Sequence, residues 1–343
     1  MEALEHASQH YKIDDDRIAV RGFSMGGAGC WQMAVHHSDL FFAANPGAGF
    51  SETPEFLRSL QKETLTPTDF ERKLWRMYDC PGYADNLFQL PTVAYSGELD
   101  IQKQAADIME TALAERKLKL THIIGPETKH TIDPASMKII EEKMDHLAEV
   151  GRAKLPTELH FATFTLKYNR LHWLTVTGMD QHWEPSTVRA KLIPQNNAIE
   201  IIADNVTSLQ LSIPAGRSSF RPDEPVSIAF ASSKQTPLIA SQPETDGSWQ
   251  CDLYRESGVW RLGQPQVKGL QKVHNLQGPI DDAFMDSFIV VRPTGQARQE
   301  LVGRWTQSEL KHLVVEWRRH FRGDAVVKDD TEITHHDLKN NHL

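Results

Sequence analysis

The first 150 residues alternate between short apolar runs and longer amphipathic stretches. The pattern predicts a helix over 2–11, a polar turn of three aspartates, and a buried strand in the apolar run at 18–20. A second helix ends near His37, and a short strand near 41–44 follows it. Helices and strands that alternate in this way are typical of an α/β domain with a parallel sheet.

The same alternation continues further along the chain. We predict strands at 92–95 and 118–124 and helices at 103–116 and 134–150. In open sheets of this kind, functional side chains gather in the loops at the carboxyl ends of the strands. The segment 51–77 has a mostly helical, polar pattern and lies between two strands, so we interpret it as an inserted lid or wall of a substrate site.

Beyond Pro156 the pattern changes to short apolar runs separated by turn residues. These runs predict strands at 159–166, 171–176, 188–192, 198–203, 208–213 and 226–231. From about Gly258 the mixed pattern returns, with a strand at 287–291, a helix at 299–321 and a polar end at 334–343. The predicted fold class is α/β, with an α/β domain over 1–152, a β-rich, sandwich-like domain over 155–257 and a C-terminal α/β segment over 258–343.

The length and charge of the chain narrow the range of functions. Its 343 residues exceed what one core usually organises, and no segment is apolar enough to cross a membrane. The net charge of −9 argues against a nucleic-acid partner, and we interpret the basic run at 318–322 as the solvated end of a helix. Cys30, Cys80 and Cys251 lie too far apart for a CxxC site and allow at most one disulfide bond.

The first residues carry acidic charge and no apolar run, so we do not expect them to form a secretory signal. We expect either a cytoplasmic protein or a native N-terminus further upstream, as in an exported bacterial parent. The sequence predicts neither the compartment nor the oligomeric state.

A serine flanked by glycines joins the strand at 18–20 to the helix behind it, in the run Gly22-Phe23-Ser24-Met25-Gly26-Gly27. A Gly-x-Ser-x-Gly motif in this position forms a nucleophile elbow, a tight turn that presents the serine hydroxyl at the edge of the sheet. We expect side chains at Gly22 and Gly26 to collide with the neighbouring strand and helix. Ser24 is therefore the candidate nucleophile.

An elbow serine needs an acid and a histidine base, which follow it along the chain in that order. Asp100 lies in the loop after one predicted strand, and His130 lies in the loop after the next. Glu98 is the alternative acid, but it comes earlier in its loop, where it can hold the turn. His122 is the alternative base, but it falls within a predicted strand. We expect His130 to take the proton from Ser24 and Asp100 to fix the imidazole tautomer.

The backbone N–H of Met25 is the expected oxyanion-hole donor, supported by the positive end of the helix that it begins. Two histidine groups were weighed as metal sites, His6 with His10 and His335-His336 with His342. Neither group has a third ligand at a recognisable spacing. We therefore expect no metal and no cofactor.

These motifs resemble the prolyl oligopeptidase (S9) family of serine peptidases in the α/β-hydrolase superfamily. The resemblance rests on residues 21–27, on residues 95–100 and on the His130 loop, and it spans about residues 1–150. It implies a partial α/β-hydrolase sheet, the triad Ser24, Asp100 and His130, and a peptide substrate.

The family normally places several strands and helices before the elbow, including the loop with the second oxyanion donor. Only one helix and one strand precede Ser24 here, so we expect the chain to begin within the domain, and its end at 340–343 suggests a second truncation. Loss of one oxyanion donor costs about a hundred- to a thousandfold in turnover. We therefore expect a hydrolase parent and weak or no activity in this chain.

The sequence thus predicts a serine hydrolase that forms an acyl-enzyme, with a peptide substrate favoured on resemblance alone. An esterase acting on small or carbohydrate esters is the first alternative, because the same triad attacks both kinds of carbonyl. A non-catalytic binding protein with a degenerate hydrolase fold is the second. It would hold a glycan or a protein on Trp173, Trp183 and Trp249, which we interpret primarily as core residues.

Overall fold

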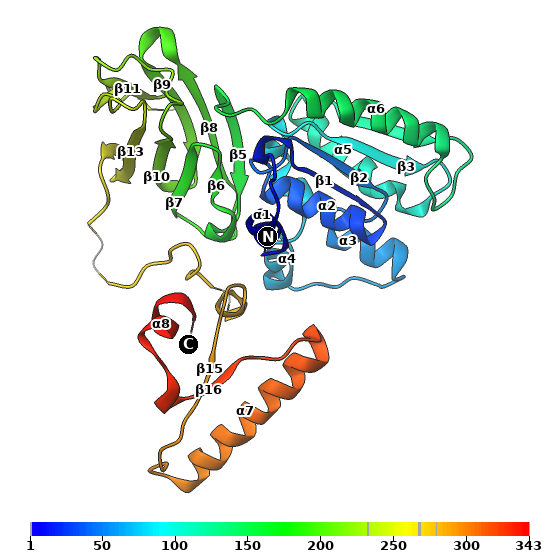
Figure 1. Ribbon diagram of the computed structural model, residues 1–343, viewed down its shortest axis with the longest axis vertical. Helices are drawn as coiled ribbons and strands as arrows, with labels where there is room; N and C mark the ends of the chain where they lie inside the picture. The colour runs from blue at the N-terminus through cyan, green and yellow to red at the C-terminus, as the bar shows by residue number, and fades with distance from the viewer. Residues whose placement is uncertain (1, 232, 267–268, 279, 343) are drawn as a thin grey trace. The chain divides into compact units, whose positions relative to one another are not determined.

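The computed structural model describes residues 2–231, 233–266, 269–278 and 280–342. It divides into two compact units, Met1–Leu270 and Gln271–Leu343 (Figure 1). The first unit begins with a parallel sheet of strand order β1-β2-β3-β4. These strands are β1 (Ala19–Phe23), β2 (Ala43–Gly47), β3 (Val93–Gly97) and β4 (Thr121–Gly125).

The helices of this region lie between the strands in sequence. The longer ones are α1 (Glu2–His10), α2 (Met25–His36), α5 (Gln104–Glu115) and α6 (Pro134–Val150). The shorter ones are η1 (Asp15–Arg17), α3 (Thr53–Glu55), the π-helical turn η2 (Phe56–Leu60), α4 (Asp69–Trp75), η3 (Cys80–Phe88) and η4 (Ile101–Lys103). The inserted segment at 51–77 is therefore less helical than its sequence predicts.

Helices cover both faces of the parallel sheet (Figure 1). Ala94 belongs to a core shared with Trp31 of α2 and Met109 of α5, whereas its neighbour Val93 belongs to a second core with Ile140 of α6. Successive side chains of a strand point to opposite faces, which explains this division. All neighbouring strands run in parallel, so their carboxyl ends meet at the same edge.

Two larger sheets follow in the first unit, with strand orders β14-β13-β10-β7-β6 and β12-β11-β9-β8-β5. Their strands are β5 (Glu158–Thr163), β6 (Arg170–Leu171), β7 (Leu174–Met179), β8 (Ser186–Ile193), β9 (Ala198–Asp204), β10 (Val206–Ile213), β11 (Val226–Phe230), β12 (Leu238–Ala240), β13 (Trp249–Glu256) and β14 (Val259–Leu262). The 3-10 turn η5 (Leu166–Tyr168) lies between β5 and β6 in sequence, and the 3-10 turn η6 (Pro194–Asn196) lies between β8 and β9. Leu159 and Ile201 of one sheet share a core with Val176, Leu211 and Leu253 of the other.

Strands β12, β13 and β14 were not predicted from the sequence. Strand β13 alternates buried Trp249, Cys251 and Leu253 with exposed or half-buried polar residues, and β14 pairs with it. The sheet therefore extends beyond residue 258, from which the sequence predicts the return to a mixed pattern. The three-part division of the chain stays a prediction.

The second unit contains a parallel strand pair, β15 (Val290–Arg292) and β16 (Val327–Asp329), separated in sequence by the helix α7 (Glu300–Phe321). Its other elements are η7 (Ile280–Phe284), η8 (Asp330–Glu332) and α8 (His335–Asn340). The ring of Trp317 on α7 packs against Phe288 and Phe321, at centroid distances of 4.8 and 4.4 Å. The helix predicted at 299–321 is thus found, and the polar end contains the short helix α8.

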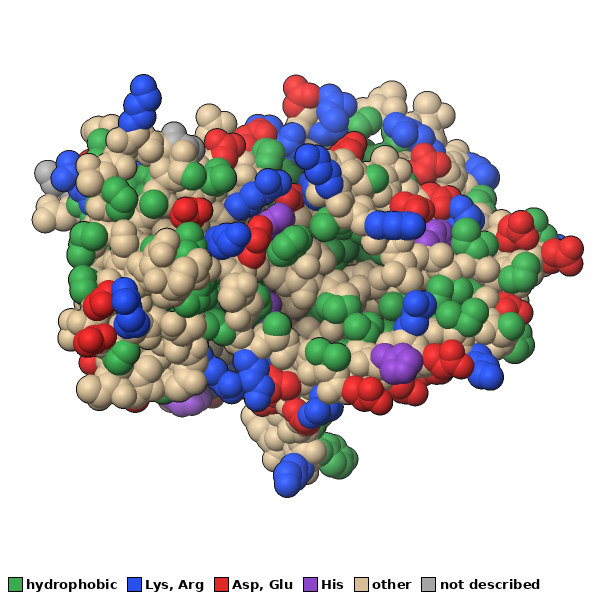
Figure 2. Space-filling model, turned by 90° about the horizontal axis from the view of Figure 1, so that it is seen from above, with side chains coloured by type: hydrophobic (Ala, Val, Ile, Leu, Met, Phe, Trp, Pro, Cys, Tyr) green, Lys and Arg blue, Asp and Glu red, His purple; other side chains and the backbone are tan. Residues whose placement is uncertain are grey.

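Acidic and basic side chains are interspersed on the face of the molecule that Figure 2 shows. The basic run at the end of α7 is exposed, and Arg318 pairs with Asp324 at 3.0 Å. The expectation that the chain binds no nucleic acid stays a prediction based on net charge. In the described part of the chain, no helix has both the length and the apolar character needed to span a membrane.

Candidate active site

Ser24 lies on the tight turn between β1 and α2. Its backbone has φ 59° and ψ −120°, in a region that costs a non-glycine residue free energy. The N–H of Ser24 donates to the carbonyl of Gly47 at 2.8 Å, and its own carbonyl accepts from the N–H of Ala28 at 3.1 Å. The strained turn is therefore held by both a strand and a helix, as a nucleophile elbow requires.

The glycines around Ser24 differ in how much space they have. A Cβ atom at Gly22 would lie 2.0 Å from the carbonyl oxygen of Gly26, so no side chain fits at Gly22. The same expectation is wrong for Gly26, where a Cβ would meet none of the described atoms within 4 Å. The crowded residue is Gly27, whose Cβ would lie 2.1 Å from the carbonyl oxygen of Gly47. Helix α2 therefore approaches both β1, at Gly22, and the end of β2, at Gly47, closely.

His130 lies in the loop after β4 and reaches back to the elbow. Its Nε2 atom lies 2.8 Å from Oγ of Ser24. Its ring packs against the ring of Phe23, with centroids 5.0 Å apart. The His130 side chain is 42% exposed, and Ser24 is half-buried, so both residues are partly open to solvent.

Asp100 lies after β3, on the other side of His130. Its Oδ2 atom accepts a hydrogen bond from Nδ1 of His130 at 2.8 Å, and its Oδ1 atom accepts from the N–H of Gln102 at 2.9 Å. The Asp100 side chain is only 1% exposed. An ionised carboxylate can only accept, so this contact places the proton on Nδ1 and leaves the lone pair of Nε2 facing Ser24. Neutral His130 in this tautomer can act as a general base.

The two alternative residues occupy other places. Oε2 of Glu98 accepts from the N–H of Glu127 at 2.8 Å and so holds the turn. His122 lies within β4, where its Nε2 atom is 3.0 Å from Oγ of Ser96. Burial of His122 lowers the pKa of its imidazole. The structure therefore brings Asp100 and His130 to the elbow, and not Glu98 and His122.

Tyr95 of β3 supports the histidine loop, a role that is not predicted from the sequence. Its hydroxyl donates to the carbonyl of Thr131 at 2.9 Å and accepts from the N–H of Asp133 at 2.9 Å. These two residues follow His130 closely in the chain. A buried phenol needs hydrogen-bond partners, so a tyrosine within a predicted buried strand could have indicated this supporting role.

Met25 is the first residue of α2, and its backbone N–H is one of the helix donors that have no intrahelical partner. The positive end of the helix dipole lies at the same place. This N–H is therefore suited to stabilise negative charge on a carbonyl oxygen attacked by Ser24.

One side-chain cluster in the described residues has the composition of a metal site. Asp107 and Glu110 of α5 and His122 of β4 offer ligand atoms within 4.8 Å of one another. Lys103 already binds the Asp107 carboxylate, at 2.5 and 2.8 Å. The two histidine groups weighed from the sequence form no such cluster in the part of the chain that the structure describes.

Two of the three tryptophans considered as a binding platform are core residues. Trp173 and Trp249 are each 3% exposed. Their indole N–H groups donate to the carbonyls of Pro156 at 2.7 Å and Ser241 at 2.8 Å. Trp183 is half-buried and lies at a positive φ of 67°. The three cysteines of the chain are buried and free.

Comparison with known protein families finds a match for the first part of the chain. Residues 1–150 match the model of the prolyl oligopeptidase family. A search among curated proteins finds no match.

Solved structures are similar to part of the chain. A puromycin-hydrolyzing peptidase of Mycobacterium tuberculosis is 21% identical, with a TM-score of 0.36, and the match covers 43% of this chain and 24% of that one. S-formylglutathione hydrolases of Staphylococcus aureus and Agrobacterium tumefaciens are each 20% identical, with TM-scores of 0.32 and 0.33. Each match covers 43% of this chain, and they cover 61% and 54% of the two hydrolases. The chain thus spans less than two thirds of the length of each of these proteins.

The parallel sheet with helices on both faces is α/β-hydrolase-like, and the elbow lies where such a sheet presents its functional side chains. The family model covers the whole of this sheet and its helices. Residues 1–150 of the chain are thus similar to the prolyl oligopeptidase family, whose model they match.

Proposed function

We propose that the chain is a serine hydrolase that cleaves its substrate through an acyl-enzyme intermediate. The observation that carries the proposal is the pair of 2.8 Å contacts that joins Ser24 to His130 and His130 to Asp100. The strained φ of 59° at Ser24 supports it, because strain at an elbow positions the nucleophile for attack.

In the proposed mechanism, Oγ of Ser24 attacks the substrate carbonyl carbon while Nε2 of His130 takes the hydroxyl proton. The carbonyl oxygen becomes an oxyanion, which the N–H of Met25 stabilises. His130 then gives its proton to the leaving group, and the acyl group stays on Ser24. A water molecule then attacks the carbonyl carbon of the acyl-enzyme while His130 takes its proton. His130 returns this proton to Oγ of Ser24, and the acid is released. Asp100 holds the imidazole and stabilises its positive charge throughout.

We propose a peptide as the substrate, because the family that matches residues 1–150 is one of peptidases by its name. We also propose that the two five-stranded sheets form one sandwich-like domain, since their inner faces share a single core. In this proposal the α/β domain over 1–152 carries the chemistry and the domain over 155–257 follows it.

The direct test is labelling of the whole chain with a fluorophosphonate probe, which reacts with activated serines. The sequence predicts weak or no activity, but the contacts between Ser24, His130 and Asp100 lead us to expect labelling of the unchanged chain. Labelling of Ser24→Ala should be at least a thousandfold slower. Ser8→Ala removes an exposed hydroxyl on α1 and is the matched control, which should label normally. If the unchanged chain is not labelled, or if Ser24→Ala labels as fast as Ser8→Ala, the proposed activity of this chain is overturned.

The same three proteins then distinguish the substrates. Ser24-dependent cleavage of a peptide panel is the expected result. Ser24-dependent hydrolysis of p-nitrophenyl acetate without cleavage of any peptide would identify an esterase instead.

A further inference from the structure

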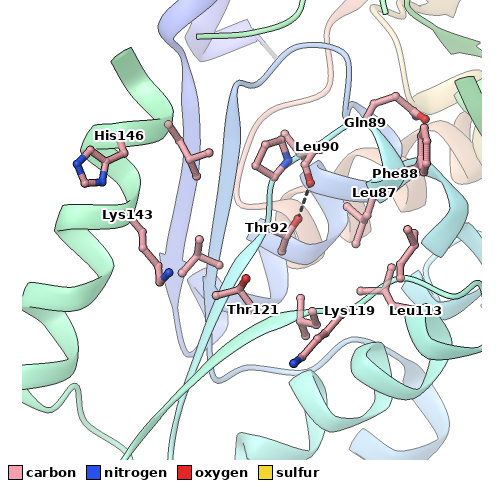
Figure 3. Close-up of a pocket in the computed structure, with 15 residues that line it drawn as sticks. Leu87, Phe88, Gln89, Leu90, Thr92, Leu113, Lys119, Thr121, Lys143 and His146 are labelled. Carbon is pink, nitrogen blue, oxygen red and sulfur yellow. Dashed lines mark hydrogen bonds between the residues drawn. The ribbon is translucent and has the colours of Figure 1, made fainter. Parts of the chain in front are cut away.

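A cavity of about 560 Å³ opens at the end of the parallel sheet opposite to Ser24 (Figure 3). Its lining includes Thr92, directly before β3, and Thr121, the first residue of β4. The carboxyl ends of these two strands lead to Asp100 and His130. The cavity thus lies at the amino ends of the strands, away from the chemistry proposed above.

The walls of the cavity are more apolar than polar and come from several elements. Six leucines line it, and they belong to η3 and the turn after it, to α5, to the segment before β4 and to α6. They are Leu87, Leu90, Leu113, Leu118, Leu120 and Leu147. Leu90 and Leu120 are buried, at 2% and 5% exposure, so packing in the core fixes their places in the wall. A volume within about 300–1,000 Å³ and a mostly apolar lining are typical of small-molecule sites.

Positive charge lies at the mouth of this apolar space. Lys143 of α6 and Lys119, before β4, extend on either side of Thr121 (Figure 3). His146 lies three residues after Lys143 on the same helix and also lines the cavity. None of the 15 lining residues is acidic, although the chain carries a net charge of −9.

The two lysines are exposed, and neither ammonium group forms an ion pair with a carboxylate among the residues described here. Other lysines of this region do find partners, as Lys103 does with Asp107. An apolar cavity whose rim has two unpaired cations is complementary to a ligand with an aliphatic body and a single anionic end.

We propose that this cavity binds a free, unbranched monocarboxylate of medium chain length. The carboxylate lies between Lys119 and Lys143 and accepts charge-assisted hydrogen bonds from both ammonium groups. The aliphatic chain lies among the leucines, where its burial is favoured by the hydrophobic effect. The site does not depend on Ser24, so it stands or falls separately from the proposed hydrolase activity.

Isothermal titration calorimetry of the whole chain with octanoate tests the proposal, with 1-octanol and acetate as comparison ligands. We expect saturable octanoate binding that is at least tenfold tighter than the binding of either comparison ligand. The double variant Lys119→Met, Lys143→Met keeps the aliphatic stems but removes both charges, so octanoate binding should weaken at least tenfold while binding of 1-octanol changes less than twofold. Lys138→Met removes an exposed charge elsewhere on α6 and should leave octanoate binding unchanged.

A variant that blocks the space separates the cavity from the rim. Thr121→Trp replaces an exposed side chain at the mouth and should abolish binding of octanoate, with unchanged far-UV circular dichroism as evidence of folding. Octanoate should also slow acetylation of Lys119 and Lys143, but not of Lys138, in a mass-spectrometric assay.

Three results would overturn the proposal. The first is octanoate binding no tighter than that of acetate. The second is an equal loss of binding in Lys138→Met. The third is binding to anionic phospholipid vesicles without any binding of dissolved octanoate, which would identify a membrane surface as the partner. Since Ser24→Ala should bind octanoate normally, failure of the hydrolase proposal and failure of this one are distinguishable.

Discussion

The side-chain amide of Asn86 pairs with the backbone of Ala162 through two hydrogen bonds. Its Oδ1 atom accepts from the N–H of Ala162 at 2.7 Å, and its Nδ2 group donates to the carbonyl of the same residue at 3.0 Å. The Nδ2 group also donates to the carbonyl of Val35 at 2.7 Å. Since β5 is the last strand of its sheet, Asn86 of η3 supplies the partner that a further strand would supply.

We expect Asn86→Ala to lower the free energy of unfolding by about 3 kcal/mol, because three hydrogen bonds to buried groups are lost at once. Gln89 pairs in the same way with His160 but is only half-buried, so Gln89→Ala should cost about 1 kcal/mol. Urea unfolding followed by tryptophan fluorescence measures both. Equal midpoints for the two variants would contradict the importance of burial.

A second prediction concerns the acid of the proposed triad. Asp100→Asn keeps the shape of the side chain but can no longer hold the histidine in its reactive tautomer, so kcat/KM should fall by about 10³ to 10⁴. Glu98→Gln keeps an acceptor for the N–H of Glu127 and should cost less than about tenfold. Hydrolysis of an activated ester measures the two rates. A larger loss in Glu98→Gln would exchange the roles of the two acids.

The positions of the candidate residues were predictable because they depend on order along the chain. A glycine-flanked serine after a short apolar run, an acid after a later strand and a histidine after the next one must meet at one edge of a parallel sheet. At that edge the structure places His130 2.8 Å from Oγ of Ser24 and 2.8 Å from Oδ2 of Asp100. The local sequence also predicted helix α6, since Asp133 caps it and Pro134 begins it.

Features that depend on tertiary contacts were not predictable. Strand β2 ends in Asn45, Pro46 and Gly47, which read as a turn, yet the whole strand is buried between two neighbours. Strand β13 carries charged residues on its outward positions, and this concealed its buried alternation. The spacing of glycines did not reveal which of them touches another element, because that depends on how α2 approaches β2.

The glycines of the elbow give a third prediction. A methyl group at Gly27 would overlap the carbonyl oxygen of Gly47, at 2.1 Å, and the backbone on both sides must move to relieve it. We expect Gly27→Ala to lower the free energy of unfolding by about 3 kcal/mol or more. Gly26→Ala has open space and gains helix propensity, so it should leave stability unchanged or raise it by up to about 1 kcal/mol.

Thermal unfolding of the two variants beside the unchanged chain provides the measurement. The comparison is sharp because the same methyl group is added at adjacent residues of one helix. If Gly26→Ala were the more damaging change, the prediction from the sequence that a side chain at Gly26 collides with its neighbours would be correct after all.

The last prediction follows from His36, at the end of α2. Its ring stacks on Tyr168, with centroids 3.8 Å apart, and meets Tyr83 edge-on at 4.3 Å. Its side chain is only 7% exposed. Burial lowers the pKa of His36 from 6.5 to about 3, because the charged form loses its hydration.

This shift ties stability to pH in a definite direction. The unfolded chain takes up a proton at His36 below pH 6.5, whereas the folded chain does so only near pH 3. In that window the unfolded state binds more protons, so the free energy of unfolding falls as the pH falls. Between pH 7.5 and pH 5 the contribution of His36 amounts to about 2 kcal/mol.

His36→Phe keeps a ring between the two tyrosines and removes the titrating group. The variant should therefore lose about 2 kcal/mol less stability than the unchanged chain between pH 7.5 and pH 5. Urea unfolding at pH 7.5, 6 and 5 measures the difference. His146→Phe, at an exposed position of α6, is the control and should follow the unchanged chain. His172 is half-buried, and desolvation lowers its pKa to about 4, so a residual slope is expected in every variant. If His36→Phe and the unchanged chain lose stability in parallel, His36 is hydrated or already charged in the folded state.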